Sequence, residues 1–262
     1  MSDINIKKGH NIGIAGVPST DVIQSFSPKT VSIQPTEFRG VKPKILVKEG
    51  DIVKVGSALF QNKSNPEIMW PSLGAGTVSK IQYGPRRVVE NIVIDLAEKE
   101  EFEIAKAYRP AEIAILDRNE VVESLLKGNL FPFLRQRPYN KVVNHKDVPR
   151  DIFISGWNTA PLSVDLDVAL RGRLSPFQAG INILKILTSG NVHLSYNRNT
   201  VSDTLLEVQN VNHNLLSGPH PSGNVGIQIH HIAPLSINDI VWTINAQDVV
   251  RVGNYFLTGK LD

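Results

Sequence analysis

The period of the hydrophobic pattern changes near residue 100, and this change constrains the fold most strongly. Before it, short β-branched runs are separated by turn-forming glycine, proline and asparagine. After it, apolar residues recur with helical spacing between compact apolar strands. Many short strands with frequent turns indicate a small barrel or sandwich, whereas alternating strands and helices indicate a parallel sheet. A chain of 262 residues has room for both modules.

The first module is predicted to consist of strands only. Its strands are expected at residues 31–33, 45–47, 52–55, 58–60, 77–81 and 88–96. Residues 1–30 predict a strand followed by an extended arm that wraps around a neighbouring unit. Residues 97–116 carry many charges and predict a solvated connector. The predicted organisation is therefore an arm (1–30), a β domain (31–100) and an α/β domain (101–262).

The second module is predicted to start with a helix that begins at Asp117 and Glu120, the pattern of a capping box, and ends at Gly128. Another helix is expected from a cap at Ser175 to Gly190. Strands are expected at 152–155, 192–196, 205–211, 227–232 and 239–243, and a closing helix, with Gly253 as its weak point, at 245–257. This order predicts a Rossmann-like fold with a mostly parallel sheet and right-handed crossovers.

One shaped loop, SGPHPSGNVGIQIHH at residues 217–231, stands out in this module. Glycine permits positive φ and close backbone approach, and proline fixes φ, so the loop is constrained. Loops at the carboxyl ends of strands are where α/β domains hold ligands, although such loops are more often plain turns. The loop does not match a nucleotide phosphate-binding loop, because Asn224 and Val225 occupy the positions where Lys and Ser or Thr are needed. The candidate cofactor-binding residues are Gly218, His220, Gly223, Gly226, His230 and Trp242.

The same region is rich in histidine, with His213, His220, His230 and His231 in a stretch without Lys or Arg. Residues 227–232 are expected to be a strand, so the adjacent His230 and His231 would point to opposite faces. No zinc-type histidine spacing occurs, and the chain has no cysteine for thiolate ligands. The sequence predicts no metal site and no catalytic residue. Trp157, which follows an expected strand, is a candidate to line a pocket.

The charge is mildly basic, +3 overall, with a basic segment from Arg135 to Arg150. Such a segment can face lipid, nucleic acid or an acidic protein partner, or simply lie in solvent. No nucleic-acid recognition motif accompanies it, so a nucleic-acid partner is not expected. No apolar run approaches the roughly 20 residues of a membrane helix. Any membrane contact is therefore expected to be made through partners.

Two stretches of the first module resemble the barrel-sandwich hybrid fold of biotinyl and lipoyl carrier domains. They are VKEGDIVKVGSALFQ at residues 47–61 and MWPSLGAGTVSKI at residues 69–81. The resemblance implies the fold but not the carrier function. Lys63 stands in the corresponding turn without the acidic or Met context of a modified lysine.

Six blocks in order resemble the A subunit of the bacterial sodium-translocating NADH:quinone oxidoreductase. They lie at residues 4–9, 47–54, 59–66, 134–142, 218–226 and 242–259. The resemblance implies a peripheral subunit on the cytoplasmic side of the bacterial inner membrane, with the other subunits of the complex as partners. It also implies that the α/β part resembles the flavoprotein subunit of complex I.

The complex of that family oxidises NADH, reduces ubiquinone or menaquinone and exports sodium, using flavins and an iron–sulfur centre of other subunits. The resemblance implies no cofactor bound by this chain itself. Family members continue further, so the chain is expected to be an amino-terminal fragment without the later domains. Its expected role is structural docking, with a contribution to the quinone region. The alternative is a free-standing small-molecule or metal-binding enzyme that uses the loop at residues 217–231.

Overall fold

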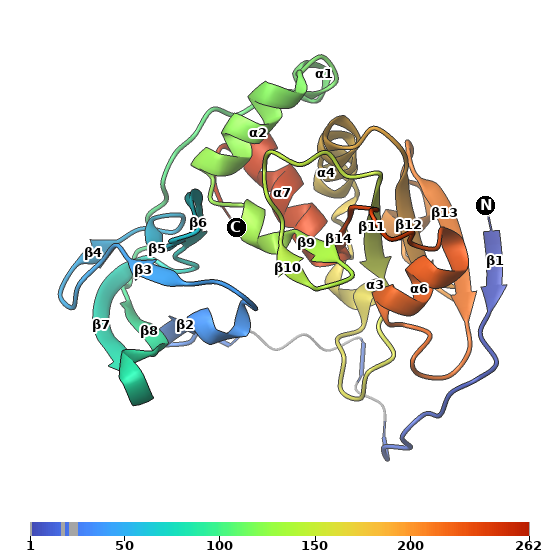
Figure 1. Ribbon diagram of the computed structural model, residues 1–262, viewed down its shortest axis with the longest axis horizontal. Helices are drawn as coiled ribbons and strands as arrows, with labels where there is room; N and C mark the ends of the chain where they lie inside the picture. The colour runs from blue at the N-terminus through green and yellow to red at the C-terminus, as the bar shows by residue number, and fades with distance from the viewer. Residues whose placement is uncertain (1, 17–18, 21–25, 262) are drawn as a thin grey trace. The chain divides into compact units, whose positions relative to one another are not determined.

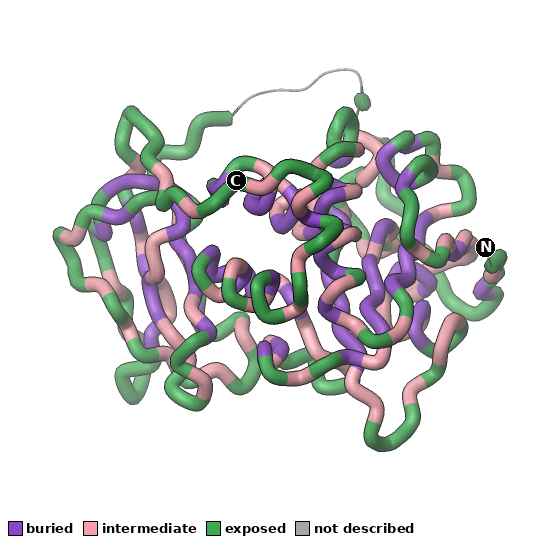
Figure 2. The backbone as a smooth tube through the Cα atoms, turned by 90° about the horizontal axis from the view of Figure 1, so that it is seen from above, coloured by how far each residue is buried: buried purple, intermediate pink, exposed green. Residues whose placement is uncertain are grey.

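The computed structural model describes residues 2–16, 19–20 and 26–261, and these form two compact bodies (Figure 1). The α/β body combines the start of the chain with Gln136–Pro138 and Val148–Gly253. The barrel body combines Phe26–Arg135, Tyr139–Asp147 and the stretch from Asn254 onward. Figure 2 shows that buried stretches run through the interior of each body while the connecting loops are exposed.

Two antiparallel sheets make up most of the barrel body, which confirms the expected β module. The strands are β2 (Thr30–Ile33), β8 (Val89–Leu96), β7 (Gly76–Tyr83) and β4 (Ile52–Val53) in one sheet, and β3 (Pro43–Ile45), β5 (Ala58–Asn62) and β6 (Asn65–Pro71) in the other. Strand β6 was not predicted, because its prolines read as turn signals. It lies at the edge of its sheet, where proline is tolerated.

Aromatic side chains fill the core of this body. Phe60 and Trp70 are buried and stack with ring centroids 4.7 Å apart, and Phe38 meets Trp70 edge-on at 5.1 Å. Short 3-10 helices occur at η1 (Pro35–Glu37), η2 (Pro85–Arg87) and η3 (Phe131–Phe133). The turn at residues 63–64 between β5 and β6 leaves Lys63 exposed.

Two helices, α1 (Pro110–Ile113) and α2 (Arg118–Lys127), complete the barrel body. The capping box of α2 is confirmed. The amide of Glu120 donates to the Asp117 carboxylate and the amide of Asp117 donates to the Glu120 carboxylate, each at 2.9 Å. Gly128 occupies the C-cap as predicted. These local contacts satisfy amides that the first helical turn leaves unpaired.

A parallel sheet forms the centre of the α/β body. Its strand order is β1 (Ser2–Asn5), β13 (Asn212–Ser217), β12 (Val192–Asn197), β11 (Asp151–Gly156) and β14 (Val241–Asn245). The helices are α3 (Leu166–Ala169), α4 (Leu174–Leu187), α5 (Asp203–Leu206), α6 (Val225–Ile232) and α7 (Ala246–Thr258). Two short strands, β9 (Arg135–Arg137) and β10 (Lys141–Val142), precede them in the chain. The parallel pairing confirms the predicted α/β architecture.

Helices cover both faces of this sheet. The connection from β11 to β12 and the connection from β13 to β14 run across the sheet in opposite directions. Right-handed crossovers therefore place α4 and α6 on opposite faces, as Figure 1 shows. On the α4 side, a Cβ at Gly253 of α7 would overlap the carbonyl of Pro176. Gly253 is thus needed for close packing between α4 and α7 and is not a weak point.

The structure corrects several predicted elements. Residues 227–232 form helix α6 and not a strand. Residues 205–211 contain the end of α5 and a loop, and the next strand begins only at Asn212. Helix α4 begins at Leu174 with Arg173 at its N-cap, and it ends at Leu187. Ser175 is therefore inside the helix, and Gly190 lies beyond it. The predicted arm boundary at residue 30 stays a prediction, and part of the arm lies outside the described residues.

Candidate functional site

The carboxyl ends of the parallel strands bring together the loops that follow β11, β12 and β13. The chain leaves β11 toward β12 and, after β13, returns to the other side of β11 as β14. Such a reversal of strand order opens a crevice at the carboxyl ends, where α/β domains bind ligands. The constrained loop at residues 218–224 leads from β13 into α6 at this edge.

Tight turns and backbone hydrogen bonds shape this loop. The amide of Ser222 donates to the Pro219 carbonyl at 3.0 Å, and the amide of Asn224 donates to the Pro221 carbonyl at 2.8 Å. The hydroxyl of Ser222, which is fully buried, donates to the Gly218 carbonyl at 2.9 Å. The loop is therefore fixed by its own groups.

The start of the chain braces the loop from one side. Gly218 adopts φ of +123°, and a Cβ there would overlap the carbonyl oxygen of Ile6. The amide of His10 donates to the His220 carbonyl at 2.9 Å, and the amide of His220 donates to the Asn11 side chain at 2.8 Å. Two sequence blocks that are about 210 residues apart thus form one structure.

Thr159, in the loop after β11, braces the other side. Its hydroxyl accepts a hydrogen bond from the Gly223 amide at 3.0 Å and lies 3.0 Å from Nδ1 of His220. A Cβ at Gly223 would overlap the backbone nitrogen of Thr159. A hydroxyl beside an imidazole is a possible nucleophile–base pair. Here the Gly223 amide already occupies a lone pair of the Thr159 hydroxyl oxygen. The contact between Thr159 and His220 therefore has a structural role and fixes the position of His220.

The first turn of α6 and its surroundings complete the loop region. Asn224 is at the N-cap of α6 but makes no side-chain capping bond. A Cβ at Gly226 would lie 2.8 Å from the Arg137 guanidinium, so this glycine gives room to the arginine. The side-chain amide of Gln228, a residue that is 1% exposed, donates a hydrogen bond to the Gly223 carbonyl at 3.1 Å. The helix and the loop are therefore tied to each other.

A cavity of about 350 Å³ opens at the carboxyl ends of β11 and β12. Trp157 contributes to its wall, as the sequence suggested, and polar groups predominate. The wall consists of Gly156, Trp157, Asn158, Ser163, Val164, Asp165, Leu166, Asp167, Asn197, Asn199 and Thr200. Several of these polar groups satisfy their own loops: Asp165 accepts from the Asp167 amide, and Asn158 accepts from the Ala160 amide, each at 2.9 Å. The cavity suits a small polar ligand held by hydrogen bonds.

The remaining sequence-predicted site residues lie apart from the loop. Trp242 is fully buried in β14, where it belongs to the sheet core. His230 and His231 are on α6 with ring centroids 5.2 Å apart, because the segment is a helix and not a strand. His213 has both ring nitrogens engaged, with the Tyr196 hydroxyl at 3.1 Å and the Val208 carbonyl at 3.0 Å. Among the candidates, the structure therefore brings together Gly218, His220, Gly223 and Gly226.

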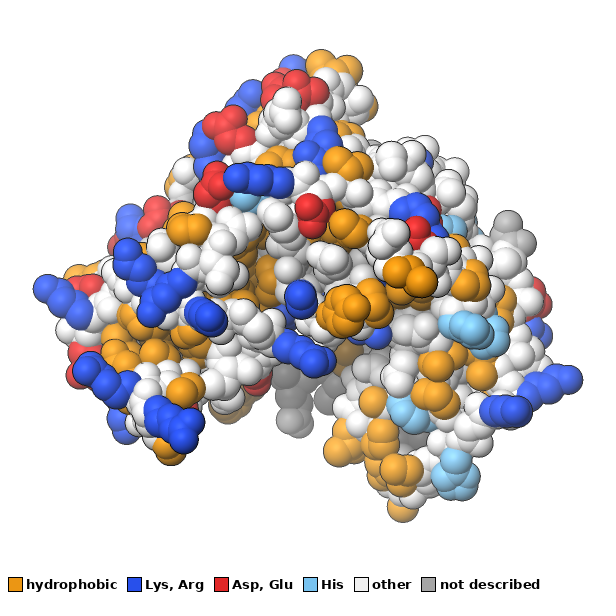
Figure 3. All heavy atoms as spheres, in the orientation of Figure 1, with side chains coloured by type: hydrophobic (Ala, Val, Ile, Leu, Met, Phe, Trp, Pro, Cys, Tyr) orange, Lys and Arg blue, Asp and Glu red, His pale blue; other side chains and the backbone are white. Residues whose placement is uncertain are grey.

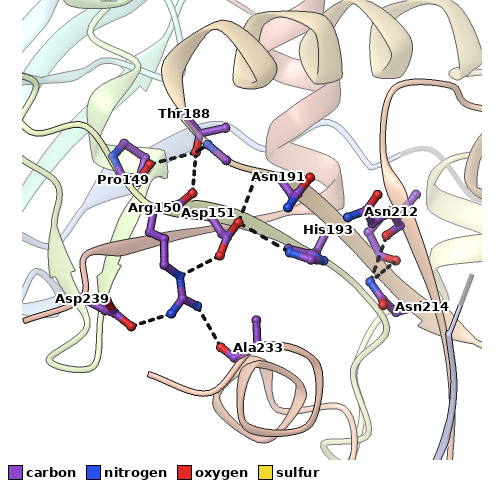
Figure 4. Close-up of polar contacts among 12 residues, drawn as sticks. Pro149, Arg150, Asp151, Thr188, Asn191, His193, Asn212, Asn214, Ala233 and Asp239 are labelled. Atoms are coloured by element: carbon purple, nitrogen blue, oxygen red, sulfur yellow. Dashed lines mark hydrogen bonds and ion pairs between the residues drawn. The ribbon is translucent and has the colours of Figure 1, made fainter. Parts of the chain in front are cut away.

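A buried polar network at the amino-terminal edge of the sheet was missed by sequence reasoning. Arg150 donates to Asp151 at 2.8 Å and to the Ala233 carbonyl at 2.9 Å, and it pairs with Asp239 (Figure 4). His193 lies 3.7 Å from Asp151, and burial lowers its pKa, while Asp151 opposes the shift. In the sequence, the adjacent opposite charges of Arg150 and Asp151 were the only local indication of this network.

The basic segment at residues 135–150 does not present a uniform basic surface. Arg135 lies over the ring of Phe38, 4.8 Å from its centroid, and Arg150 belongs to the buried network. Figure 3 shows other Lys and Arg side chains spread over the visible face of strands β2 to β8. The segment is thus partly structural.

The residues that the structure describes offer neither a metal centre nor a membrane-spanning helix. No group of three or more His, Asp or Glu side chains within these residues is arranged to hold a metal ion. Likewise, none of the helices formed by the residues described is long and apolar enough to cross a bilayer.

Two family models match the chain in succession. Residues 4–97 match the NqrA N-terminal barrel-sandwich hybrid domain, and residues 116–261 match the NqrA second alpha/beta domain. Both matches confirm the predicted fold class: a barrel-sandwich hybrid module followed by an α/β domain.

Longer relatives give the same result. The chain is 37% identical over 258 residues to the A subunit of the Na(+)-translocating NADH-quinone reductase of Saccharophagus degradans, covering 98% of this chain and 57% of that protein. It is 35% identical over 260 residues to the proteins of the same name from Serratia proteamaculans and Neisseria meningitidis serogroup B, covering 99% of this chain and 58% of each. The chain thus spans somewhat more than half the length of these relatives.

Proposed function

Since the chain belongs to the NqrA family, we propose that it serves as part of the A subunit in a respiratory sodium-translocating NADH:quinone oxidoreductase. In this role it is a peripheral subunit on the cytoplasmic side of the bacterial inner membrane. It contacts the membrane through its partner subunits, which carry the flavins and the iron–sulfur centre. The observation that carries the proposal is that two successive stretches of the chain, residues 4–97 and 116–261, match two successive domains of one family in the same order.

Within that complex, the role proposed for this stretch is docking. The loop at residues 218–224 supports it, because the loop is held from both sides by Asn11 and Thr159 and presents a fixed surface. A rigid surface binds a partner without losing further conformational entropy. The loop also lies beside the carboxyl-edge crevice, so a contribution to the quinone region is part of the proposal.

Replacement of Gly223 by Trp in the assembled complex tests this role. A side chain at Gly223 would overlap Thr159 and displace the loop. We expect less of the membrane-bound redox subunits to copurify with the tagged chain, and less sodium-dependent NADH:quinone reductase activity in membranes. Gly13→Trp is the matched control, because no atom of the described residues lies within 4 Å of a Cβ at Gly13.

A second variant separates docking from misfolding. Thr159→Val removes both contacts of the hydroxyl with little change in volume, and circular dichroism of the purified variants reports whether they fold. Folded variants with normal assembly and activity would contradict the docking role of the loop. Failure of the wild-type chain to copurify with redox subunits would contradict the proposed function itself. In that case, bound metal or NADH oxidation by the purified chain would favour the free-standing enzyme.

A further inference from the structure

The hairpin of strands β7 and β8 extends beyond its sheet. Strand β2 pairs with β8 only at residues 92–95, and β4 pairs with β7 only at residues 76–77. The hairpin ladder itself continues to the pair of Tyr83 and Val89. Among the described strands, none flanks residues 82–91, so this part of the hairpin is a two-stranded ribbon with η2 at its free end (Figure 1). The tip of such a ribbon is accessible to a partner.

The turn at this tip has a backbone that does not suit its residues. Arg86 and Arg87 both have positive φ, +56° and +58°. The amide of Val88 donates to the Pro85 carbonyl at 3.2 Å and closes the turn. Two consecutive left-handed residues define a type I′ turn, which strongly favours Asn-Gly, Asp-Gly or Gly-Gly. Arginine is strained there, because its Cβ approaches a backbone oxygen, so turn chemistry does not explain the two arginines.

Contacts within the barrel body do not explain the arginines either. Among the described residues, the exposed side chains of Arg86 and Arg87 form no hydrogen bond or ion pair. The acidic side chains nearby in the fold are engaged elsewhere. Glu90 of β8 accepts from the Gln82 side chain at 3.2 Å, and Glu49 accepts from a backbone amide of β7 at 2.8 Å. Both positive charges at the tip are therefore available to a partner.

The surroundings of the tip favour an acidic protein as that partner. Residues 29–88 carry ten Lys and Arg against four Asp and Glu, and Figure 3 shows many of these cations on the visible face of the barrel strands. Tyr83 and Val88, on either side of the turn, are 51% and 48% exposed. Arginine and tyrosine are enriched at protein interfaces, whereas lysine is depleted there. The planar guanidinium also matches a carboxylate in a bidentate pair.

We propose that the tip of the β7–β8 hairpin, residues 83–88, binds an acidic segment of a partner protein, whose carboxylates pair with Arg86 and Arg87. The inference concerns the barrel body alone and does not depend on the proposed function. Strain in the turn is then part of the binding site. The two arginines lower the stability of the free chain, but they hold two guanidinium groups at a defined place.

Replacing both arginines tests the proposal with two measurements on the purified full chain. Arg86→Asn/Arg87→Gly introduces the residue pair that a type I′ turn prefers. We expect this variant to unfold at a higher urea concentration than the wild type, because the strain in the turn is relieved. In calorimetry, it should bind a poly-glutamate peptide about ten-fold more weakly, because two charge-assisted contacts are lost.

Three controls separate the hairpin tip from the general charge of the body. Lys44→Gln/Lys63→Gln also removes two exposed positive charges, but from β3 and from the turn between β5 and β6. It should change the affinity for poly-glutamate by less than about two-fold, as is usual for exposed charges. A neutral peptide of Gly and Ser should not bind. Vesicles that contain phosphatidylserine should bind the wild type and the arginine variant equally.

Several results would overturn the proposal. The wild type could fail to bind poly-glutamate, or the arginine variant could bind it as tightly as the wild type. An equal loss of affinity in the lysine control would show that only overall charge matters. Vesicle binding that weakens in the arginine variant, with poly-glutamate binding unchanged, would assign the tip to a membrane surface. A lower unfolding midpoint of that variant would show that the arginines stabilise the fold instead.

Discussion

Replacing Arg150 with Met should destabilise the α/β body, because this side chain ties three segments together. Its guanidinium donates to Asp151 at the start of β11 and to the carbonyl of Ala233 at the end of α6, and it pairs with Asp239 before β14 (Figure 4). Met keeps the apolar stem but removes all of these bonds. The carboxylate of Asp151, 9% exposed, then remains buried without its cation.

The expected loss of stability follows from these contacts. Breaking a buried ion pair costs about 3–5 kcal/mol, whereas an exposed pair contributes about 0–1 kcal/mol. The Arg150 side chain is 35% exposed, and Asp151 keeps a hydrogen bond from the Asn191 amide at 2.9 Å, so we place the ionic part at about 1–2 kcal/mol. The lost bond to the Ala233 carbonyl adds about 1 kcal/mol. The total is about 2–3 kcal/mol.

Urea unfolding measures this loss, and hydrogen exchange of α6 locates it. We expect amides of residues 225–232 to exchange faster, because the end of the helix loses its anchor. Arg109→Met is the matched control: Arg109 is 82% exposed and pairs with Glu112, so its loss should change stability by less than about 1 kcal/mol. The reasoning is refuted if Arg150→Met is no more destabilising than this control.

Two further predictions concern His193 and Gly218. Burial lowers the pKa of His193, so as pH falls below about 6.5 the unfolded chain takes up a proton that the folded chain resists. Stability should therefore decrease from about pH 7.5 to about pH 5.5 in urea unfolding, and less so in His193→Gln. Gly218→Ala should cost more than about 2 kcal/mol, since φ is +123° and the Cβ meets the Ile6 carbonyl. Gly13→Ala adds a Cβ that meets no atom of the described part of the chain, so it should differ from wild type by less than about 0.5 kcal/mol in the same assay.

The parts of the fold that follow from local chemistry could be predicted from the sequence. The capping box at Asp117 and Glu120 needs only residues three apart, and it forms as expected. The apolar face of α4 and the compact strands β11 and β12 also follow from spacing within one element. Strand and helix alternation then leaves few topologies, because crossovers are right-handed.

Helix α6 shows where local pattern is not sufficient. Its run of apolar residues is too short for periodicity to distinguish a strand from a buried helix. Tertiary packing decides, because Ile229 enters a cluster with Phe153 of β11 and Val241 of β14. The wrong prediction of a strand at 227–232 also placed His230 and His231 on opposite faces, whereas they are neighbours on one exposed helix end.

The buried polar network could not be predicted for a different reason. Arg150, His193 and Asp239 come from separate elements, and the sheet register alone brings them together. Each residue by itself resembles an ordinary surface or core residue.

The glycines of the candidate loop explain why separated sequence blocks carried the resemblance so well. Gly9 and Gly218 each lie where a Cβ would overlap a backbone carbonyl of the other block, and Gly223 lies against Thr159 in the same way. Such contacts involve backbone on both sides, so neither partner can adjust by changing a rotamer. The identity of these residues is therefore dictated by the path of the chain. A polar side chain on the same surface is not constrained in this way. The backbone contacts therefore fix the shape of the loop, but they do not fix which polar groups the loop presents to a docking partner.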